Sequence, residues 1–136
     1  GDARAMLAGG ADALIPPYFV AGFDAMRVLS RRNDDPAGAA RPFDRDRDGF
    51  LVGESGAVMV LEPLEAARAR GAEVLFEVAG YGSSNDAHHL TDPDPSGVPQ
   101  ALAVTAALRD AGVAPEQVAH VNAHGGGSRP GDPSEV

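Results

Sequence analysis

The sequence contains no cysteine, no tryptophan and no lysine. Without cysteine it cannot form a disulfide, a thiolate zinc site or a cysteine nucleophile of its own. Without lysine it cannot form a P-loop, and it contains no G-x-G-x-x-G motif either. No apolar run reaches the ~18 residues that span a bilayer, and no signal peptide opens the chain. These absences predict a soluble, cytoplasmic protein without membrane contact.

Aromatic side chains and positive charge are scarce. Aromatics make up 5% of the residues and hydrophobic residues 43%, so a core would consist mainly of alanine, valine and leucine. The net charge of −9 argues against nucleic-acid binding, because phosphates require a basic surface. The length of 136 residues fits one domain or part of one.

Both ends of the sequence predict a fragment of a larger protein. The opening "GDARAMLAGG" reads as if it were already entering a strand. The closing "GDPSEV" reads as the start of a helix, in which Asp132 would cap the helix and Glu135 would complete a capping box.

Alternating strand and helix patterns predict an α/β layered domain. Period-two and apolar runs predict strands at residues 5–13, 50–61, 73–84 and 119–127. Helical periodicity with proline starts and glycine ends predicts helices that begin at Pro17, Pro63 and Val98, and a helical turn at residues 115–118. Glu54 stands inside an apolar strand pattern, so we expect its carboxylate to pair with an arginine or a backbone amide.

The stretch "RPFDRDRDGF" resembles the beginning of a calcium-binding EF-hand loop. Three alternate carboxylates and a glycine occupy the required positions: Asp44, Asp46, Asp48 and Gly49. Position 12 of that loop is Ser55 instead of glutamate, and Pro42 interrupts any helix that would enter it. The favoured interpretation is a charged turn before a buried strand, with Arg45 and Arg47 paired to the aspartates.

A second cluster contains residue types that can bind a metal, but their arrangement argues against a metal site. Two histidines and three aspartates share one loop: Asp86, His88, His89, Asp92 and Asp94. Imidazole and carboxylate both bind zinc. Adjacent histidines rarely point the same way, however, so no metal site is predicted.

His124 opens the stretch "HGGGS", which can be interpreted in three ways. An HGGG loop supplies the oxyanion hole of lipases, but those enzymes need a G-x-S-x-G elbow, and "GESGA" lacks its last glycine. The glycines can equally serve a tight turn. His124 itself follows an apolar run, which would place its imidazole at the carboxyl edge of a sheet, where α/β sites lie. On this ground alone, a structural and a catalytic histidine both remain open.

Four long stretches together resemble the β-ketoacyl-acyl carrier protein synthases, most closely the elongating condensing enzymes. They are "LAGGADALIPP", "GFDAMRVLSRRNDDPAGAARPFDRDRDGFLVGESGAVMVLE", "RGAEVLFEVAGYGSSNDAHHLTDPDPSG" and "VNAHGGGSRPGDPSE". The resemblance covers essentially the whole chain. It implies part of a thiolase-like fold with α/β/α/β/α layers, in which residues 1–72 end the N-terminal half and residues 73–136 begin the C-terminal half.

The resemblance also implies a reaction. A cysteine takes an acyl group from acyl carrier protein, malonyl-carrier loses CO₂, and the carbanion attacks the acyl thioester. Two histidines and a lysine stabilise the developing charge. His124 matches the first histidine; the cysteine would precede residue 1, and the other two would follow residue 136. The fragment alone is therefore predicted to be inactive. The substrate would arrive on the phosphopantetheine arm of the carrier, with no cofactor bound directly.

Further site residues follow from the same resemblance. Phe23 matches a residue that lines the acyl pocket, His89 and Thr91 match loop residues near the condensation chamber, and Ser128 replaces a threonine that binds the pantetheine arm. The chain departs from the family at Gly126, which is usually threonine, and at Gly127, which is often serine. A lost hydroxyl contact costs about 0.5–1.5 kcal/mol of binding.

The resemblance finally implies partners. Arg27 falls where the family places a basic residue by the carrier entrance, and Arg31 and Arg32 lie nearby. Because carrier proteins are acidic, these three arginines suit docking, although ordinary surface solvation explains them equally well. A homodimer and malonyl and acyl thioester substrates are expected. The alternative is a non-catalytic relative that binds or measures chains, which has no need of His124.

Overall fold

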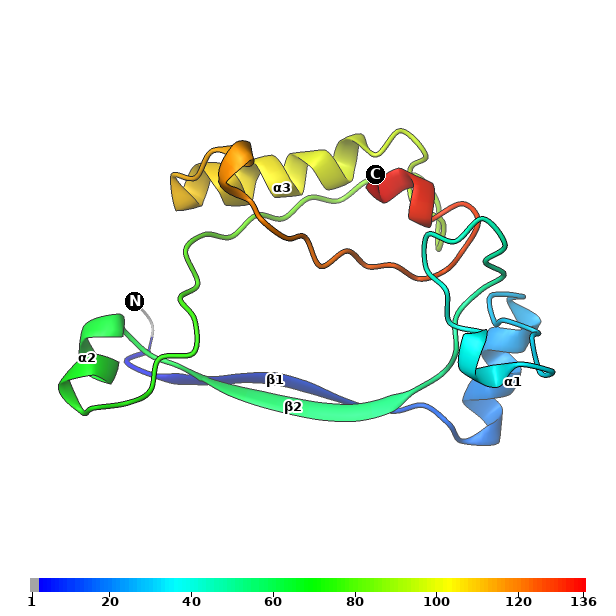
Figure 1. The fold of residues 1–136 in the computed structure, drawn as a ribbon, viewed down its shortest axis with the longest axis horizontal. Helices are drawn as coiled ribbons and strands as arrows, with labels where there is room; N and C mark the ends of the chain where they lie inside the picture. The colour runs from blue at the N-terminus through cyan, green and yellow to red at the C-terminus, as the bar shows by residue number, and fades with distance from the viewer. Residues whose placement is uncertain (1–2) are drawn as a thin grey trace.

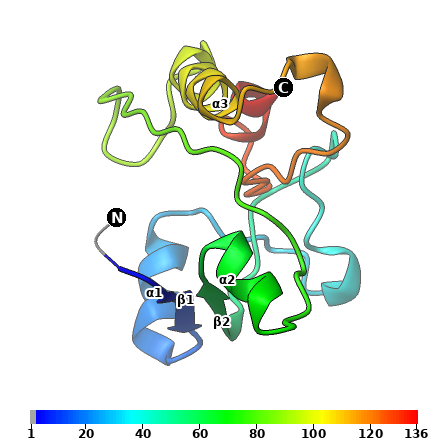
Figure 2. The ribbon, with the colours of Figure 1, turned by 90° about the vertical axis from the view of Figure 1, so that its left-hand side faces the viewer.

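The computed structural model describes residues 3–136 as an open assembly of one two-stranded sheet and several helices (Figure 1). Strand β1 (Met6–Ala13) pairs antiparallel with β2 (Glu54–Leu61), with Met6 opposite Leu61 and Ala13 opposite Glu54. Helices α1 (Pro17–Ala25) and α2 (Leu64–Ala69) lie at opposite ends of this two-stranded sheet. Helix α3 (Val98–Ala111) lies in a separate upper layer, as the view in Figure 2 also shows.

Three short 3₁₀ helices complete the described elements. They are η1 (Pro36–Gly38), η2 (Pro115–Gln117) and η3 (Asp132–Glu135). Within residues 3–136, no helix is long and apolar enough to cross a bilayer.

Local sequence signals place most of these elements correctly. The strand expected at residues 5–13 and the three helices are confirmed, each helix with proline at or just before its first residues. Helix α3 ends at Gly112, whose φ of 65° provides the left-handed C-cap that the glycine predicts. The expected strand 50–61 begins later, at Glu54, and Phe50 forms only an isolated parallel bridge with Leu29.

Two expected strands are wrong for the described chain. Residues 73–84 and 119–127 carry no strand, and neither 73–84 nor 119–126 makes a backbone–backbone hydrogen bond within residues 3–136. A strand needs a neighbour to pair with, and no described segment supplies one. Residues 80–84 pack along α3 instead. The amide of Tyr81 donates to Asp110 Oδ2 at 2.9 Å, and a Cβ on Gly82 would collide with the carbonyl oxygen of Ala103.

Apolar side chains remain widely exposed on the two-stranded sheet. Leu7 on β1 is 72% exposed and Val58 on β2 is 70% exposed. Ala39 and Ala67 are the only buried hydrophobic residues among those described. A two-stranded sheet with both faces bare is marginal in water, so these faces need further protein to cover them.

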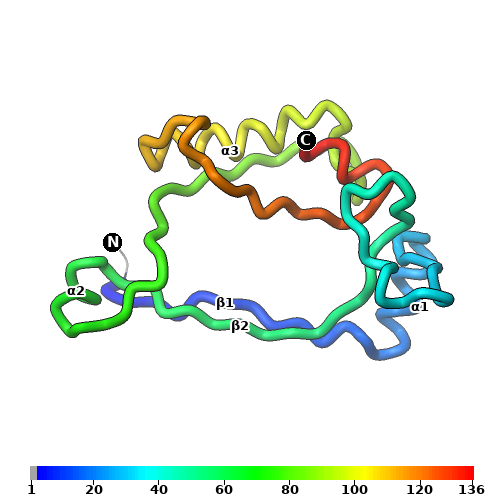
Figure 3. The backbone as a smooth tube through the Cα atoms, in the orientation of Figure 1, coloured from blue at the N-terminus to red at the C-terminus, as the bar shows by residue number. Residues whose placement is uncertain are grey.

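The most buried part of the described chain lies at the junction of two distant segments. Apart from Ala67, every buried residue falls within residues 39–49 or 127–134. Figure 3 shows these two segments side by side at one end of the molecule. This junction, and not an apolar core, positions the candidate site.

Candidate functional site

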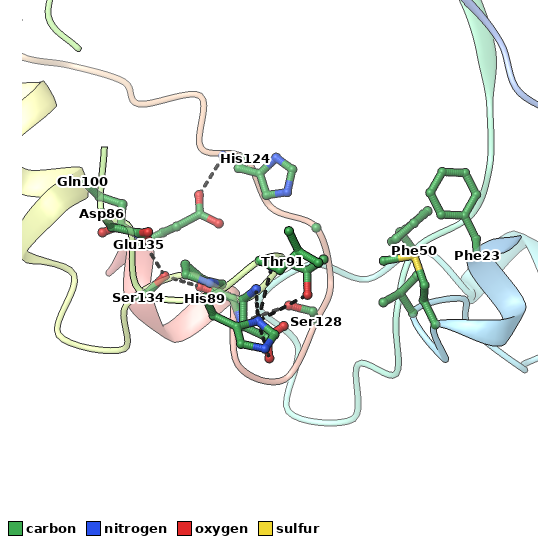
Figure 4. Close-up of a pocket in the computed structure, with 17 residues that line it drawn as sticks. Phe23, Phe50, Asp86, His89, Thr91, Gln100, His124, Ser128, Ser134 and Glu135 are labelled. Carbon is green, nitrogen blue, oxygen red and sulfur yellow. Dashed lines mark hydrogen bonds and ion pairs between the residues drawn. The ribbon is translucent and has the colours of Figure 1, made fainter. Parts of the chain in front are cut away.

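A cavity of about 600 Å³ lies between the helices and the C-terminal segment (Figure 4). Five residues that the sequence singles out for catalysis or substrate binding line it together: Phe23, His89, Thr91, His124 and Ser128. They come from α1, from the loop before α3 and from the glycine-rich segment before η3. The fold therefore gathers residues that are more than a hundred positions apart, from Phe23 to Ser128.

One end of the cavity is apolar. Phe23 and Phe50 meet edge to face, with ring centroids 5.4 Å apart, and Met26 and Val28 extend the same surface. Figure 4 shows the two aromatic rings at the opposite end from Asp86 and Gln100. This surface suits an apolar group of a ligand, because transfer of apolar groups out of water is favourable.

His124 lines the cavity, and the carboxylate of Glu135 holds its backbone. Glu135 Oε2 accepts a hydrogen bond from the His124 amide at 2.7 Å, and Oε1 accepts one from the Gly125 amide at 3.2 Å. Within residues 3–136 the imidazole itself has no hydrogen-bond partner and is exposed to the cavity. An imidazole placed in this way is free to donate to an oxygen that gains negative charge.

The loop before α3 is organised by two side chains. His89 Nδ1 accepts the amides of Thr91 at 3.2 Å and Asp92 at 3.1 Å, so the neutral ring carries its proton on Nε2. The Asp86 carboxylate accepts the amides of His88 and Asp94, both at 3.0 Å. Those two hydrogen bonds, His88 first, lower the pKa of the Asp86 carboxyl below its usual value. Asp86 is thus a site residue that the sequence suggested only as a metal ligand.

Ser128 lines the cavity between the apolar end and Asp86 (Figure 4). Its Oγ accepts the Gly131 amide at 2.9 Å, which leaves the hydroxyl proton free to donate to a bound molecule. Gln100 Oε1 is buried at the same cavity without a hydrogen-bond partner among the described residues. The cavity therefore offers both a donor and an acceptor to the polar part of a ligand.

The three arginines expected at a docking surface lie outside the cavity lining. Arg27 sits between two lining residues, Met26 and Val28, and is exposed with a φ of 58°. Arg31 pairs with Asp24 at 3.3 Å, and Arg32 pairs with Asp35 at 2.8 Å. Exposed pairs of this kind are worth little, so an acidic partner could compete for these arginines.

The aspartates that resemble a calcium loop are engaged by protein groups. Asp48 accepts Ser30 Oγ at 2.8 Å and pairs with Arg41 at 2.8 Å. The Ser30 hydroxyl and the Arg31 amide, followed by the charges of Arg41 and Arg32, lower the pKa of the Asp48 carboxyl. The expected pairing is only partly correct, because Arg45 pairs with Asp46 but Arg47 reaches outside the turn, to Asp132 at 3.3 Å.

Two expectations about carboxylates are also revised. Glu54 accepts the Ile15 amide at 3.1 Å, as one of the two expected partners, but it is exposed instead of buried. Asp132 does not cap a helix: η3 begins after Gly131, without a side-chain cap. Asp132 instead accepts the amides of Phe43 and Gly127, and Glu135 accepts the amide of His124.

Gly126 and Gly127 have different reasons to be glycine. Gly127 has a φ of 70°, and a Cβ there would lie 2.7 Å from the backbone oxygen of Gly49. Gly126 has no left-handed φ, and a Cβ there would lie 3.1 Å from His124 Nε2. A side chain at position 126 would therefore press on the imidazole, whereas one at 127 would strain the backbone.

Serine at these two positions is expected to have unequal effects. Gly127→Ser should lower the free energy of unfolding by about 1–2 kcal/mol more than Gly126→Ser, because a left-handed conformation penalises any Cβ. Chemical denaturation of the two variants beside the unsubstituted protein measures the difference. Equal stabilities would show that the loop relaxes away from the Gly49 oxygen.

Family models match almost the whole chain. "Beta-ketoacyl synthase, N-terminal domain" matches residues 1–67, and "Beta-ketoacyl synthase, C-terminal domain" matches residues 75–136. Among curated relatives, 3-oxoacyl-[acyl-carrier-protein] synthase 2 of Vibrio cholerae is 53% identical over 136 residues, and that of Synechocystis is 48% identical. Each alignment covers 100% of this chain and 33% of the relative. The chain thus spans about a third of the length of the curated relatives it matches.

Solved structures of similar proteins share the fold. A type II polyketide synthase acyl-carrier protein in complex with its ketosynthase bound to the hexaketide matches with a TM-score of 0.94 and 38% identity, over 99% of this chain and 33% of that one. A β-ketoacyl synthase from Burkholderia phymatum matches with a TM-score of 0.89 and 44% identity, over 99% and 32% of the two chains. The ishigamide ketosynthase/chain length factor gives 0.84 and 42%, over 97% and 30%. The expected thiolase-like ketosynthase fold is confirmed.

Proposed function

Because this chain belongs to the β-ketoacyl synthase family, we propose that it is part of a condensing enzyme of fatty acid or polyketide synthesis. The observation that carries the proposal is the gathering of Phe23, His89, Thr91, His124 and Ser128 around one cavity. The enzyme would be an acyltransferase that condenses malonyl-carrier with an acyl thioester. The names of the relatives, which are 3-oxoacyl-[acyl-carrier-protein] synthases and ketosynthases, support this reaction class.

The proposed reaction forms one carbon–carbon bond. The malonyl carboxylate leaves as CO₂, and the electron pair that remains on the adjacent carbon attacks the carbonyl carbon of an acyl-cysteine. The cysteine sulfur then leaves as thiolate. These 136 residues contain no cysteine, so by themselves they would form no product. His124 would donate to the thioester oxygen on which negative charge develops during CO₂ loss.

The other lining residues have proposed roles that follow from their positions. Phe23 would contact the acyl chain at the apolar end. Ser128 would bind the phosphopantetheine arm through its free hydroxyl proton, and His89 would order the loop that carries Thr91 near the condensation chamber. No cofactor of the protein's own is needed, since the arm belongs to the carrier.

The carrier protein is the proposed partner, with Arg27, Arg31 and Arg32 as its docking residues. An acyl-carrier protein bound to a similar ketosynthase supports this partnership. The proposal further includes a homodimer, a cytoplasmic location and a boundary between residues 72 and 73, near which the two family models meet. Light scattering of the complete polypeptide measures the assembly state.

The decisive experiment is a condensation assay. The complete polypeptide that carries these residues, and a Vibrio cholerae relative in which they replace the matching third, are incubated with malonyl- and acyl-carrier proteins. Mass spectrometry should detect 3-oxoacyl-carrier and CO₂ from both, and no product from residues 1–136 alone. Added salt should raise the KM for the carrier, because screening weakens docking between opposite charges.

The alternative is a non-catalytic partner that binds chains without condensing them. Similarity to the ishigamide ketosynthase/chain length factor is the observation that favours this alternative. If both proteins fold and bind the carrier but release no CO₂, the alternative is correct and the condensing role is wrong.

A further inference from the structure

The aspartate-rich turn of residues 41–49, the 41–49 turn, is fastened to the glycine-rich loop of residues 125–132, the 125–132 loop. Arg47 Nε donates to the Ser128 carbonyl at 2.9 Å, and Arg47 Nη2 donates to the Arg129 carbonyl at 3.0 Å. The Gly49 amide donates to the Gly127 carbonyl at 3.0 Å. These bonds join segments that are about eighty residues apart in sequence. The turn that resembles a calcium loop therefore supports the loop between His124 and η3.

Asp132 completes this junction with a buried carboxylate. Its side chain is 2% exposed, and that of Arg47 is 14% exposed. Asp132 Oδ2 accepts the Phe43 amide at 2.6 Å, and Oδ1 accepts the Gly127 amide at 2.9 Å. The carboxylate thus has partners in both segments, as a buried charge requires.

The same short helix holds the other end of the loop. Asp132 and Glu135 both belong to η3, and Glu135 accepts the amides of His124 and Gly125. The backbone of His124 is therefore tied to η3, and η3 is tied through Asp132 to Arg47. A planar guanidinium can donate to two carbonyls and a carboxylate at once, which a lysine ammonium cannot do in the same geometry.

We propose that Arg47 is a positioning residue of the condensing site, which holds the 125–132 loop so that His124 and Ser128 face the cavity. This inference rests on the proposed function for its catalytic consequence. Arg47 does not line the cavity itself, so it would act through the Ser128 and Arg129 carbonyls and through Asp132.

Two variants in the same turn test the role of Arg47 in the complete polypeptide. Arg47→Met removes the contacts to the loop. Arg45→Met is the matched control, because the Arg45 side chain is 93% exposed and, within residues 3–136, its only ion pair is with Asp46. At a temperature where both variants are folded, Arg47→Met should lower kcat at least tenfold, whereas Arg45→Met should stay within twofold of the original. Arg47→Lys keeps the charge but loses the planar guanidinium that donates several hydrogen bonds at once, so its kcat should fall between those of the other two variants.

Hydrogen exchange separates positioning from general stability. In Arg47→Met the amides of residues 124–128 should exchange faster, while those of β1 and β2 keep their rates. If kcat and loop exchange both match those of Arg45→Met, the inference is wrong. If Arg47→Met does not fold, Arg47→Lys decides by the same two measurements. If the unsubstituted protein does not condense, the proposed function fails, and the exchange result still tests whether Arg47 orders the loop.

Discussion

Replacing His124 with alanine is expected to lower the rate of condensation by about 10²–10³-fold, because one preorganised donor to a developing oxyanion contributes on this scale. The imidazole lines the cavity without a hydrogen-bond partner among residues 3–136, so its N–H is available to substrate. Its backbone is held by Glu135, which means that truncation of the side chain leaves the loop in place.

The loss should fall on one step of the reaction. Loading of the acyl group onto the cysteine does not require CO₂ loss, so acyl-enzyme should still form in His124→Ala. Release of CO₂ from malonyl-carrier and formation of 3-oxoacyl product should both decline. Intact-protein mass spectrometry measures the first quantity, and a coupled CO₂ assay measures the second.

His88→Ala is the matched control for His124→Ala. His88 is an exposed histidine beside the site loop that does not line the cavity, and its only hydrogen bond among the described residues runs from its backbone amide to Asp86. We expect the activity of this variant to remain within twofold of the original. If His124→Ala condensed at the original rate, the catalytic assignment of His124 would be refuted, whatever the fate of His88→Ala.

Replacing Asp132 with alanine is expected to destabilise the protein by about 3–5 kcal/mol, because it leaves the part-buried Arg47 guanidinium without its carboxylate partner. The change also removes the acceptor of the Phe43 and Gly127 amides. Asp132 is buried and Arg47 is part-buried, so solvent screens the pair little. Chemical denaturation of the complete polypeptide measures the loss.

Asp46→Ala is the control for this stability prediction. The Asp46 carboxylate is 73% exposed and among the described residues pairs only with the exposed Arg45, so its loss should change stability by less than about 0.5 kcal/mol. Asp132→Asn should fall between the two, because it keeps an acceptor oxygen but loses the charge. If Asp132→Ala were as stable as Asp46→Ala, the junction would not contribute to folding as the contacts suggest.

Local patterns predict the elements that depend on neighbouring residues. The proline starts of α1 and α3 and the glycine end of α3 act within one helical turn, so they can be read from the chain. Strand periodicity is present in residues 73–84 as well, but it yields a strand only when a partner pairs with it. No described segment does so, and glycine at position 82 lets this stretch pack against α3.

The residues that line the site are predictable from the sequence, but the hydrogen bonds that hold its loops in place are not. Resemblance to a family identifies the residues that line the cavity, and the cavity does gather them. Sequence reasoning misses the roles of Asp86, Asp132 and Glu135, since each accepts amides that local spacing does not reveal. The capping-box spacing of Asp132 and Glu135 points to a helix start, whereas both carboxylates serve loops.

By itself, the sequence determined where the helices start, the scarcity of basic residues and the family to which the chain belongs, because these depend on residue type and short-range order. Only the tertiary structure decided that the 41–49 turn supports the 125–132 loop. That choice depends on which buried carboxylate meets which guanidinium across about eighty residues, and the cost of leaving either charge unpaired makes the pairing specific.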